Sequence, residues 1–412
     1  MEEDKEDKIK EDKKEGSCAA APDPPLSRKQ KKSKRRCLRR KIERGAKEGG
    51  IKAVTKKRCS EAAQNPTKLP FSMKADMKKN ATTSGWLGKK PSGPSDTEPR
   101  QYTLRELLDP NGGQAMSYVP WNGSTLHYVL DNEDRVCMVL AGRPRDPKWD
   151  ELTKDAYSRL SLLRSQLEYD QKETNNRRGT FPTIAHGLSF GGGQKKPKHL
   201  SHGSDQKKED LLEDVMNTKS IQRLCKFASS VYEACCKGCH DYIAETVETI
   251  RATDGSLRRP YDSKVGVYPC RSFNLGPHTV SFPHKDVGNL AQSWCSVTAL
   301  GEYDHHLGGH LVLWDFKTVI QFPAGSTILL PSALFLHSNT SIQPGETRYS
   351  IIQYAAGGLF RWVENGCMTD KELGDKAEDN EDLEMTREAL RKSRWEKAVD
   401  MYTKVKKLAS LT

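Results

Sequence analysis

The chain has 412 residues, of which 67 are Lys or Arg and 55 are Asp or Glu, so its formal net charge is +12. This length allows one large domain or two ordinary ones, and the positive balance favours a polyanionic partner such as nucleic acid over a small acidic molecule alone. A hydrophobic content of 35% is low for a wholly globular chain, which predicts that part of it does not fold. The sequence has no run of 18 apolar residues and no apolar N-terminal signal, so we expect an intracellular protein that does not engage a membrane.

Residues 1–98 are rich in Lys, Glu, Ser and Pro and contain few aromatic or branched side chains. Such a segment buries too little apolar surface to offset its chain entropy, which predicts a disordered basic tail. Within it, residues 28–41 read RKQKKSKRRCLRRK and carry ten basic side chains in fourteen positions. This run indicates nuclear import, and hence the nucleus, or non-specific phosphate contacts; a solvated charge run is the alternative.

The folded part is expected to begin near residue 101. A short helix is predicted over residues 102–108, and a hairpin is predicted from strands at 126–130 and 136–140 around polar turn residues. Apolar residues at helical spacing predict a helix over 148–169, and further helical spacing over 206–251 predicts one broken or two successive helices. These helices would support one face of a sheet.

Between those helices, residues 176–200 read NRRGTFPTIAHGLSFGGGQKKPKHL. Five glycines and no long apolar run predict a loop whose backbone can approach a ligand closely. Arg177 and Arg178 could follow a DNA backbone, and Arg178 or His186 could reach toward a co-substrate. A flexible surface loop with incidental charge is the alternative.

The pattern Cys236-Lys-Gly-Cys239-His240 matches a covalent haem attachment motif, and its cysteines could begin a zinc site. No second pair of zinc ligands lies nearby in the sequence, and nothing indicates the compartment that haem attachment requires. We therefore interpret them as small, half-buried residues of a helix.

From Val267 onward the sequence changes to eight short β-type runs: VYPCRSF, TVSF, SWCSVTAL, HLVLWDF, TVIQF, TILL, LFLH and RYSIIQYAA. Turn residues separate them, which is typical of a double-sheet jelly roll. We therefore predict an α+β fold with a double-stranded β-helix (jelly-roll) core over 100–366 and supporting N-terminal helices. Residues 367–412 are predicted to be an acidic linker and a C-terminal helix.

A candidate metal site lies within these runs. His284 and Asp286 are two residues apart, so on a strand both would point to one face and could grip one ion. His337 follows an apolar run and would supply a second imidazole if the strands fold back. Two His and one carboxylate are the ligands of non-haem Fe(II) oxygenases. Arg348 and Ser350 would share a strand face and could bind a carboxylate remote from the metal.

The ordered set HKDVGN, GGHLVLW, PAG before an apolar strand, His337 and RYS resembles Fe(II)/2-oxoglutarate dioxygenases. With NRRGTFPTIAHGLSFGGG and RYSIIQYAAGGLFRWVENG, residues from about 100 to 366 resemble the fungal branch of the TET/JBP nucleic-acid base dioxygenases. The resemblance implies that His284, Asp286 and His337 hold Fe(II), and that Arg348 and Ser350 bind 2-oxoglutarate. It also implies use of O2, with ascorbate as reductant.

By motif position, the resemblance implies that His310 lines the co-substrate pocket and that Asn289 contacts the base, although Asn289 could equally cap a turn. Ala356 stands where many family members have a His, so a strict selectivity for 5-methylcytosine is in doubt. Asp315 or His310 could compensate for that missing side chain.

The sequence thus predicts a monomeric nuclear dioxygenase that flips a base out of methylated duplex DNA and oxidises 5-methylcytosine to the hydroxymethyl form and onward. Demethylation of N6-methyladenine by the same chemistry is the nearest alternative. A prolyl hydroxylase and a cupin-type small-molecule binder are more distant, since neither calls for the basic tail. A catalytically silent jelly-roll module that binds nucleic acid would be expected to have lost at least one of the four residues His284, Asp286, His337 and Arg348.

Overall fold

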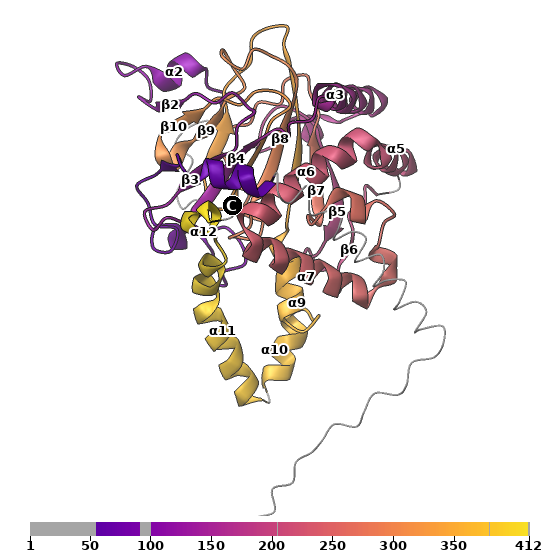
Figure 1. Ribbon diagram of the computed structural model, residues 1–412. Coiled ribbons are helices and arrows are strands. Elements are labelled where there is room, and N and C mark those ends of the chain that lie inside the picture. Colours follow the sequence, from indigo (N-terminus) through magenta and orange to yellow (C-terminus); the bar gives the residue numbers. More distant parts are fainter. Residues whose placement is uncertain (1–54, 91–99, 204, 379, 411–412) are drawn as a thin grey trace, which may run out of the picture. The chain divides into compact units, whose positions relative to one another are not determined.

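A nine-stranded sheet lies at the centre of the part of the chain that the structure, a computed structural model, describes: residues 55–90, 100–203, 205–378 and 380–410 (Figure 1). Its strand order is β1-β3-β4-β11-β8-β13-β7-β5-β6. The strands are β1 (Thr67–Lys68), β3 (His127–Leu130), β4 (Val136–Gly142), β11 (Thr327–Leu330), β8 (Cys295–Glu302), β13 (Thr347–Tyr354), β7 (Cys270–Asn274), β5 (Thr183–Ser189) and β6 (Lys198–His199). Only β1 and β3 pair in parallel; the other neighbours are antiparallel.

A second, four-stranded sheet has the order β12-β9-β10-β2. Its strands are β12 (His337–Asn339), β9 (Leu311–Leu313), β10 (Thr318–Ile320) and β2 (Ser117–Val119). The structure therefore combines helices with two sheets, as the sequence predicts. The expected hairpin is confirmed, because β3 and β4 pair with Val129 opposite Met138.

Three of the sequence expectations about strands are wrong. In the run LFLH, residues 334–337, only His337 belongs to a strand, because Leu334 N and Phe335 N both donate to Pro331 O and close a turn. The run TVSF, residues 279–282, forms no strand because it crosses between the sheets: Thr279 N donates to Arg348 O of β13, and Asn339 N of β12 donates to Ser281 O. The predicted loop at 176–200 contains β5, which pairs with β7 from Thr183 to Gly187. Its few apolar residues were too sparse to indicate a strand.

Helices cover one face of the large sheet, with α3 (Trp149–Gln166) packed against β8 and α6 (Lys219–Cys235) against β4 and β11 (Figure 1). The segment over 206–251 forms three helices, because the chain leaves helical geometry at Thr218 and again at Cys236. The three are α5 (Gln206–Asn217), α6 and α7 (Lys237–Thr253), and the short helix α8 (Asp262–Val265) follows them. Shorter elements are α2 (Leu104–Leu108), α4 (Gln171–Thr174) and the 3-10 turns Met77–Asn80, Gly255–Leu257 and Trp314–Phe316. No helix in the described ranges has both the length and the apolar character needed to cross a membrane.

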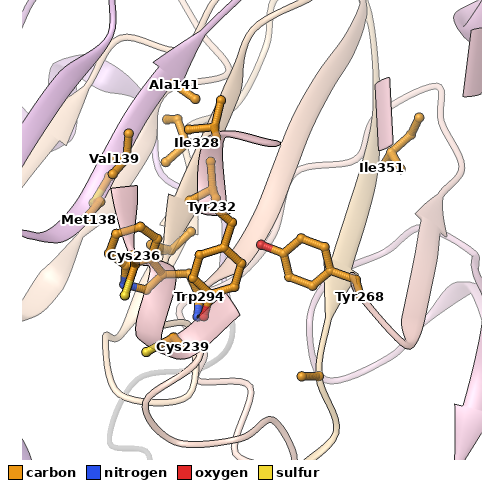
Figure 2. Close-up of a cluster of buried hydrophobic side chains, with 14 of the residues drawn as sticks. Met138, Val139, Ala141, Tyr232, Cys236, Cys239, Tyr268, Trp294, Ile328 and Ile351 are labelled. Carbon is orange, nitrogen blue, oxygen red and sulfur yellow. The ribbon is translucent and has the colours of Figure 1, made fainter. Parts of the chain in front are cut away.

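Aromatic rings fill the space between α6 and the large sheet. Tyr232 stacks on Tyr268 and Trp294 with ring centroids 5.5 and 5.2 Å apart (Figure 2). Cys236 and Cys239 lie beside these rings and are buried. Both differ from the expected half-buried residues of a helix, because they are fully buried and Cys236 stands at the break between Lys219–Cys235 and Lys237–Thr253.

Residues 55–90 are folded, which corrects the expectation of an unfolded tail as far as residue 98. Residues 55–62 are helical, β1 joins the large sheet, and Phe71, Met73 and Trp86 are buried. Trp86 lies under the guanidinium of Arg394, 4.1 Å from ring centroid to Cζ. The ring partners of Phe71, which are Phe316 and Phe335, are likewise more than 200 residues away in the sequence, so local composition could not reveal these contacts. The basic run at 28–41 lies outside the described residues.

The C-terminal part forms α9 (Gly357–Glu364), α10 (Asp370–Glu378), α11 (Glu381–Asp400) and α12 (Val405–Ala409). Helix α10 forms where the sequence predicted a linker. Trp395 and Val399 of α11 are buried, and Trp395 Nε1 donates a hydrogen bond to Lys74 O at 2.9 Å. The helix is thus docked on the N-terminal segment, and both belong to the same compact unit as residues 100–366.

Gly88 is a close contact between the N-terminal segment and the core that contains the candidate ligands. Its N–H donates to Val287 O at 3.0 Å, and a Cβ here would lie 2.4 Å from Ala333 O. We expect Gly88→Ala to lower the free energy of unfolding by about 1–3 kcal/mol, measured by urea denaturation. Gly374→Ala in α10, where a Cβ meets nothing within 4 Å, should instead raise it by about 0.5–1 kcal/mol. A stable Gly88→Ala protein would contradict the close contact.

Candidate metal centre

Two histidines face each other where the segment before Asp286 meets β12. His284 N donates to His337 O and His337 N donates to His284 O, both at 3.0 Å, so the backbones form an antiparallel bridge. The imidazole centroids are 4.4 Å apart. Asp286 completes the group, and one donor atom from each of the three residues lies within 4.8 Å of the others. The chain therefore folds back as the sequence predicted.

Backbone carbonyls orient both imidazoles. His284 Nδ1 donates to Phe282 O at 2.7 Å, and His337 Nδ1 donates to Phe335 O at 2.9 Å. Because a neutral imidazole carries one N–H, these bonds leave each Nε2 with a free lone pair, the arrangement usual for metal-binding His. Two such nitrogens and a carboxylate fit Fe(II), with positions left for a co-substrate and oxygen.

The charge state of the group also suits metal binding. Burial, with the charge of His337 nearby, lowers the pKa of His284 to about 3, and burial lowers the pKa of His337. Burial raises the pKa of the Asp286 carboxyl, but Arg178 and the two imidazoles outweigh this and hold the pKa below its usual range. At neutral pH the ligands are therefore two neutral imidazoles and a carboxylate, the forms that bind a cation.

Arg178 lies directly beside the candidate ligands. Its Nη2 is 2.7 Å from Asp286 Oδ1, an ion pair without the alignment of a hydrogen bond. Arg177 instead points to the rim, where its Nη1 donates to Lys285 O at 3.3 Å. The sequence offered Arg177 and Arg178 as candidate contacts to DNA or to a co-substrate. The structure brings Arg178 to the candidate ligands and leaves Arg177 exposed.

The candidate ligands open into a cavity of about 60 Å³ between the two sheets. Large-sheet residues line one side and small-sheet residues the other. The β13 contribution follows the strand alternation, since Ser350, Ile352 and Tyr354 all line the cavity. Ser350 Oγ accepts a hydrogen bond from Asn274 Nδ2 at 3.1 Å. Tyr354 and Asn274 were missed by the sequence reasoning, although extending the alternation from Ser350 would have found Tyr354.

Arg348 continues the same strand face and is 1% exposed. Its Nη1 donates to Thr279 O at 2.7 Å, while Nε and Nη2 have no hydrogen-bond partner among the described residues. No carboxylate in the described ranges pairs with this cation, and burial lowers its pKa. A buried guanidinium whose Nε and Nη2 are both unpaired fits a carboxylate ligand such as the far end of 2-oxoglutarate.

Asn289 lines the cavity and is buried, with its Nδ2 donating to Ser332 Oγ at 3.1 Å. His310 does not reach it. Its Nδ1 lies 2.9 Å from Thr340 Oγ1 and its ring meets Tyr118 edge-on, on the opposite face from the cavity-lining Leu311. Asp315 is also outside the cavity.

The position of Asp315 gives it a different part in the structure. Its Oδ2 accepts a hydrogen bond from Leu336 N at 2.6 Å, one residue before a candidate ligand. It therefore helps to fix the turn that presents His337. Neither Asp315 nor His310 is placed to compensate at the base for the side chain missing at Ala356.

His186 also faces away from the cavity. On β5 it pairs with Arg271 of β7, whereas the next residue of β7, Ser272, lines the cavity. Its Nε2 hydrogen-bonds with the hydroxyl of Tyr261 at 2.6 Å beneath the helices. The sequence hypothesis that His186 reaches a co-substrate is therefore wrong, because strand alternation places it on the helix-covered face.

This burial makes His186 a source of acid sensitivity. Burial, with the charges of Arg271 and Arg259, lowers its pKa to about 3. The pKa of an unfolded His is about 6.5, so as the pH falls the unfolded state binds a proton before the folded state does. Between about pH 6.5 and about pH 3 the free energy of unfolding therefore falls by about 1.4 kcal/mol per pH unit. We expect His186→Gln to flatten the fall in unfolding free energy between about pH 6 and about pH 4 in urea titrations. An unchanged slope would exclude His186 as the cause.

Comparison with known proteins gave no matching family model and no matching curated protein. Two of the solved structures that resemble the chain are distant. NgTET1 in complex with 5mC DNA has a TM-score of 0.42 and 16% sequence identity, covering 59% of this chain and 83% of that chain. An oxidoreductase of the 2OG-Fe(II) oxygenase family from Burkholderia pseudomallei has a TM-score of 0.28 and 15% identity, covering 48% of this chain and 77% of that chain.

Proposed function

We propose that this protein is an Fe(II)/2-oxoglutarate-dependent dioxygenase of the TET/JBP type. The observation that carries the proposal is the cluster of His284, Asp286 and His337, with both Nε2 lone pairs free to bind a metal, in a cavity on the strand face that Arg348 continues. We further propose that the two sheets are the halves of a double-stranded β-helix. The cavity between β13 of one sheet and β9 and β12 of the other supports this.

Each residue of the site has a separate proposed role. Fe(II) bound here would supply oxidation of a C–H bond by O2, with 2-oxoglutarate as co-substrate and ascorbate as reductant. Arg348 would hold the far carboxylate of 2-oxoglutarate through its unpaired Nε and Nη2, and Ser350 would add a hydroxyl. Phe282 and Phe335 carbonyls keep the imidazoles in the metal-binding tautomer.

We propose methylated duplex DNA as the substrate, 5-methylcytosine as the base and the nucleus as the location. A methyl group inside a duplex cannot reach a cavity between two sheets, so the nucleotide must be flipped, at a cost of a few kcal/mol. Asn289, buried at the cavity wall, is a candidate for reading the base edge. Exposed Arg177 at the rim offers a phosphate contact.

One observation favours N6-methyladenine as an alternative base. Ala356 pairs by its backbone with Asn289, so an apolar methyl group stands next to the candidate base-reading amide. Asp315 and His310, the two side chains that the sequence offered as replacements, both lie outside the cavity. Because a ferrous oxygenase can attack an N-methyl as well as a C-methyl group, this site could accept either base.

The proposal is tested by mass spectrometry of nucleosides from duplex DNA carrying both modifications, after incubation with the protein, Fe(II), 2-oxoglutarate and ascorbate. Hydroxymethylcytosine formed by the intact protein and not by His284→Ala would support the leading assignment. Loss of N6-methyladenine alone would keep the chemistry and change the base. Unchanged nucleosides without succinate formation would refute a dioxygenase.

A further inference from the structure

A second, strongly basic cleft lies between residues 78–89 and helix α11. It has a volume of about 450 Å³ and is lined by five cationic side chains and one carboxylate, Glu388. The cations are Lys78, Lys79, Lys89, Arg391 and Lys392. Glu388 is shared by Arg391 and Lys392, at 3.6 Å from each. Within the described ranges no acidic group pairs with the three lysines of the N-terminal wall.

Both walls of this cleft are fixed in place. Arg394 of α11 covers the ring of Trp86, and its Nη1 donates to Ser84 O at 2.5 Å. Trp395 anchors the same helix to the N-terminal segment. The cations are therefore held near one another by the fold, although their mutual repulsion opposes this arrangement. Such a cluster is stabilised by a ligand that carries several negative charges.

The lining favours phosphodiesters over an acidic peptide. Thr82 and Thr83 add hydroxyl groups, which contact phosphate oxygens commonly in nucleic-acid complexes. Among the lining residues only Ala81 and Trp395 are apolar, and both are buried, so the cleft offers little for peptide side chains. Lysine ammonium groups bind phosphate as point charges and need no fixed orientation of the ligand.

The cleft is connected to the candidate metal centre through one short segment. Leu87 bridges Leu290, and Ala291 N donates to Trp86 O at 3.0 Å, so the segment that carries Lys89 pairs with the loop that follows Asp286. Lys285 stands between the candidate ligands His284 and Asp286, and its carbonyl accepts the bond from Arg177. The paired backbone of these two segments therefore joins the cleft to the cavity.

We propose that this cleft binds the sugar-phosphate backbone of duplex nucleic acid while a flipped nucleotide occupies the metal cavity. Only the statement that the bound nucleic acid is the substrate of the metal centre rests on the proposed function. Backbone binding itself requires neither iron nor a methylated base.

The test is the salt dependence of binding of the full chain to unmethylated duplex DNA, measured by fluorescence anisotropy without Fe(II). Each lost phosphate contact lowers the slope of log affinity against log salt by about 0.9, so Lys78→Ala/Lys79→Ala/Lys89→Ala should lower its magnitude by about 2.7. The matched control is Lys207→Ala/Lys219→Ala/Lys226→Ala, which removes three exposed lysines of α5 and α6 and should leave the slope near that of the parent. The N-terminal basic run is present in every protein and cancels in the comparison.

Equal slopes for the two triple variants would overturn the proposal, and so would displacement of the DNA by polyglutamate as readily as by duplex competitor. Both variants change only exposed side chains, and equal urea midpoints would verify that they fold. A lowered slope in a protein that oxidises no nucleoside would refute the proposed function and leave the cleft assignment standing. If the lysine variant kept the salt slope of the parent and the parent oxidised a nucleoside, the proposed function would stand and the cleft assignment would be refuted.

Discussion

Arg348→Met is expected to stabilise the fold and to weaken 2-oxoglutarate binding at the same time. The guanidinium is buried without a carboxylate partner among the described residues, and an apolar side chain of similar length removes its desolvation cost. Replacing buried charges by apolar groups gains about 1–4 kcal/mol, from which the lost bond to Thr279 O subtracts, so we expect a net gain of about 1 kcal/mol in urea denaturation.

The loss of affinity should be larger than this gain. Two hydrogen bonds to a charged ligand are worth about 1.5–3 kcal/mol each, so the dissociation constant of 2-oxoglutarate should rise at least about 100-fold in calorimetric titrations with Mn(II) present. Arg348→Lys, which keeps the cation, should lose less affinity and gain no stability. A destabilised Arg348→Met protein that still bound 2-oxoglutarate would show that the side chain is structural.

His337→Ala is expected to weaken Mn(II) binding by more than about 100-fold, because loss of even an outer partner of a metal ligand costs about 10- to 100-fold. The loop group of Asp304, His305 and His306 provides the control, since its donor atoms are also within 4.8 Å of one another. In that group Gln321 Oε1 accepts a hydrogen bond from Trp121 N, which orients the amide so that Gln321 Nε2 donates to His306 Nδ1 at 3.0 Å. His306 Nδ1 is therefore occupied and Nε2 carries the proton, so neither nitrogen has a free lone pair for a metal. His306→Ala should therefore leave Mn(II) affinity unchanged.

Calorimetric titration of both variants distinguishes the two groups. Equal losses would mean that Mn(II) binds at the exposed loop as well as in the cavity. An unchanged affinity in His337→Ala would remove the basis for the proposed iron site.

The parts of the site that could be predicted are those that local spacing determines. His284 with Asp286, and Arg348 with Ser350, follow from the two-residue repeat of an extended chain, and the helix beginning at Trp149 follows from apolar spacing. The errors arose where the face of a strand depends on its partners. His310 stands one residue before the cavity-lining Leu311, and His186 pairs with Arg271, one residue before the cavity-lining Ser272. A shift of one residue reverses the direction of a side chain.

The same reason explains the missed N-terminal segment. Trp86 is one of few large apolar residues in a highly charged stretch, and its packing partner, Arg394, comes from the other end of the sequence. The ion pair of Arg178 with Asp286 spans 108 positions and likewise has no local signature. Contacts of this kind depend on the complete sheet, which spacing within one segment does not describe.

The pairing of residues 86–88 with the loop after Asp286 has a thermodynamic consequence. Gly88 N donates to Val287 O, so residues 86–89 and the loop after Asp286 are joined through their backbones. A metal held by Asp286 and a polyanion held by Lys89 would therefore each restrict the motion of both segments. Free-energy coupling between two ligands is reciprocal, so a metal that tightens DNA binding by some factor must itself be bound more tightly, by that same factor, when DNA is present. Measuring Mn(II) affinity with and without duplex therefore reports on the rigidity of this connection without any turnover.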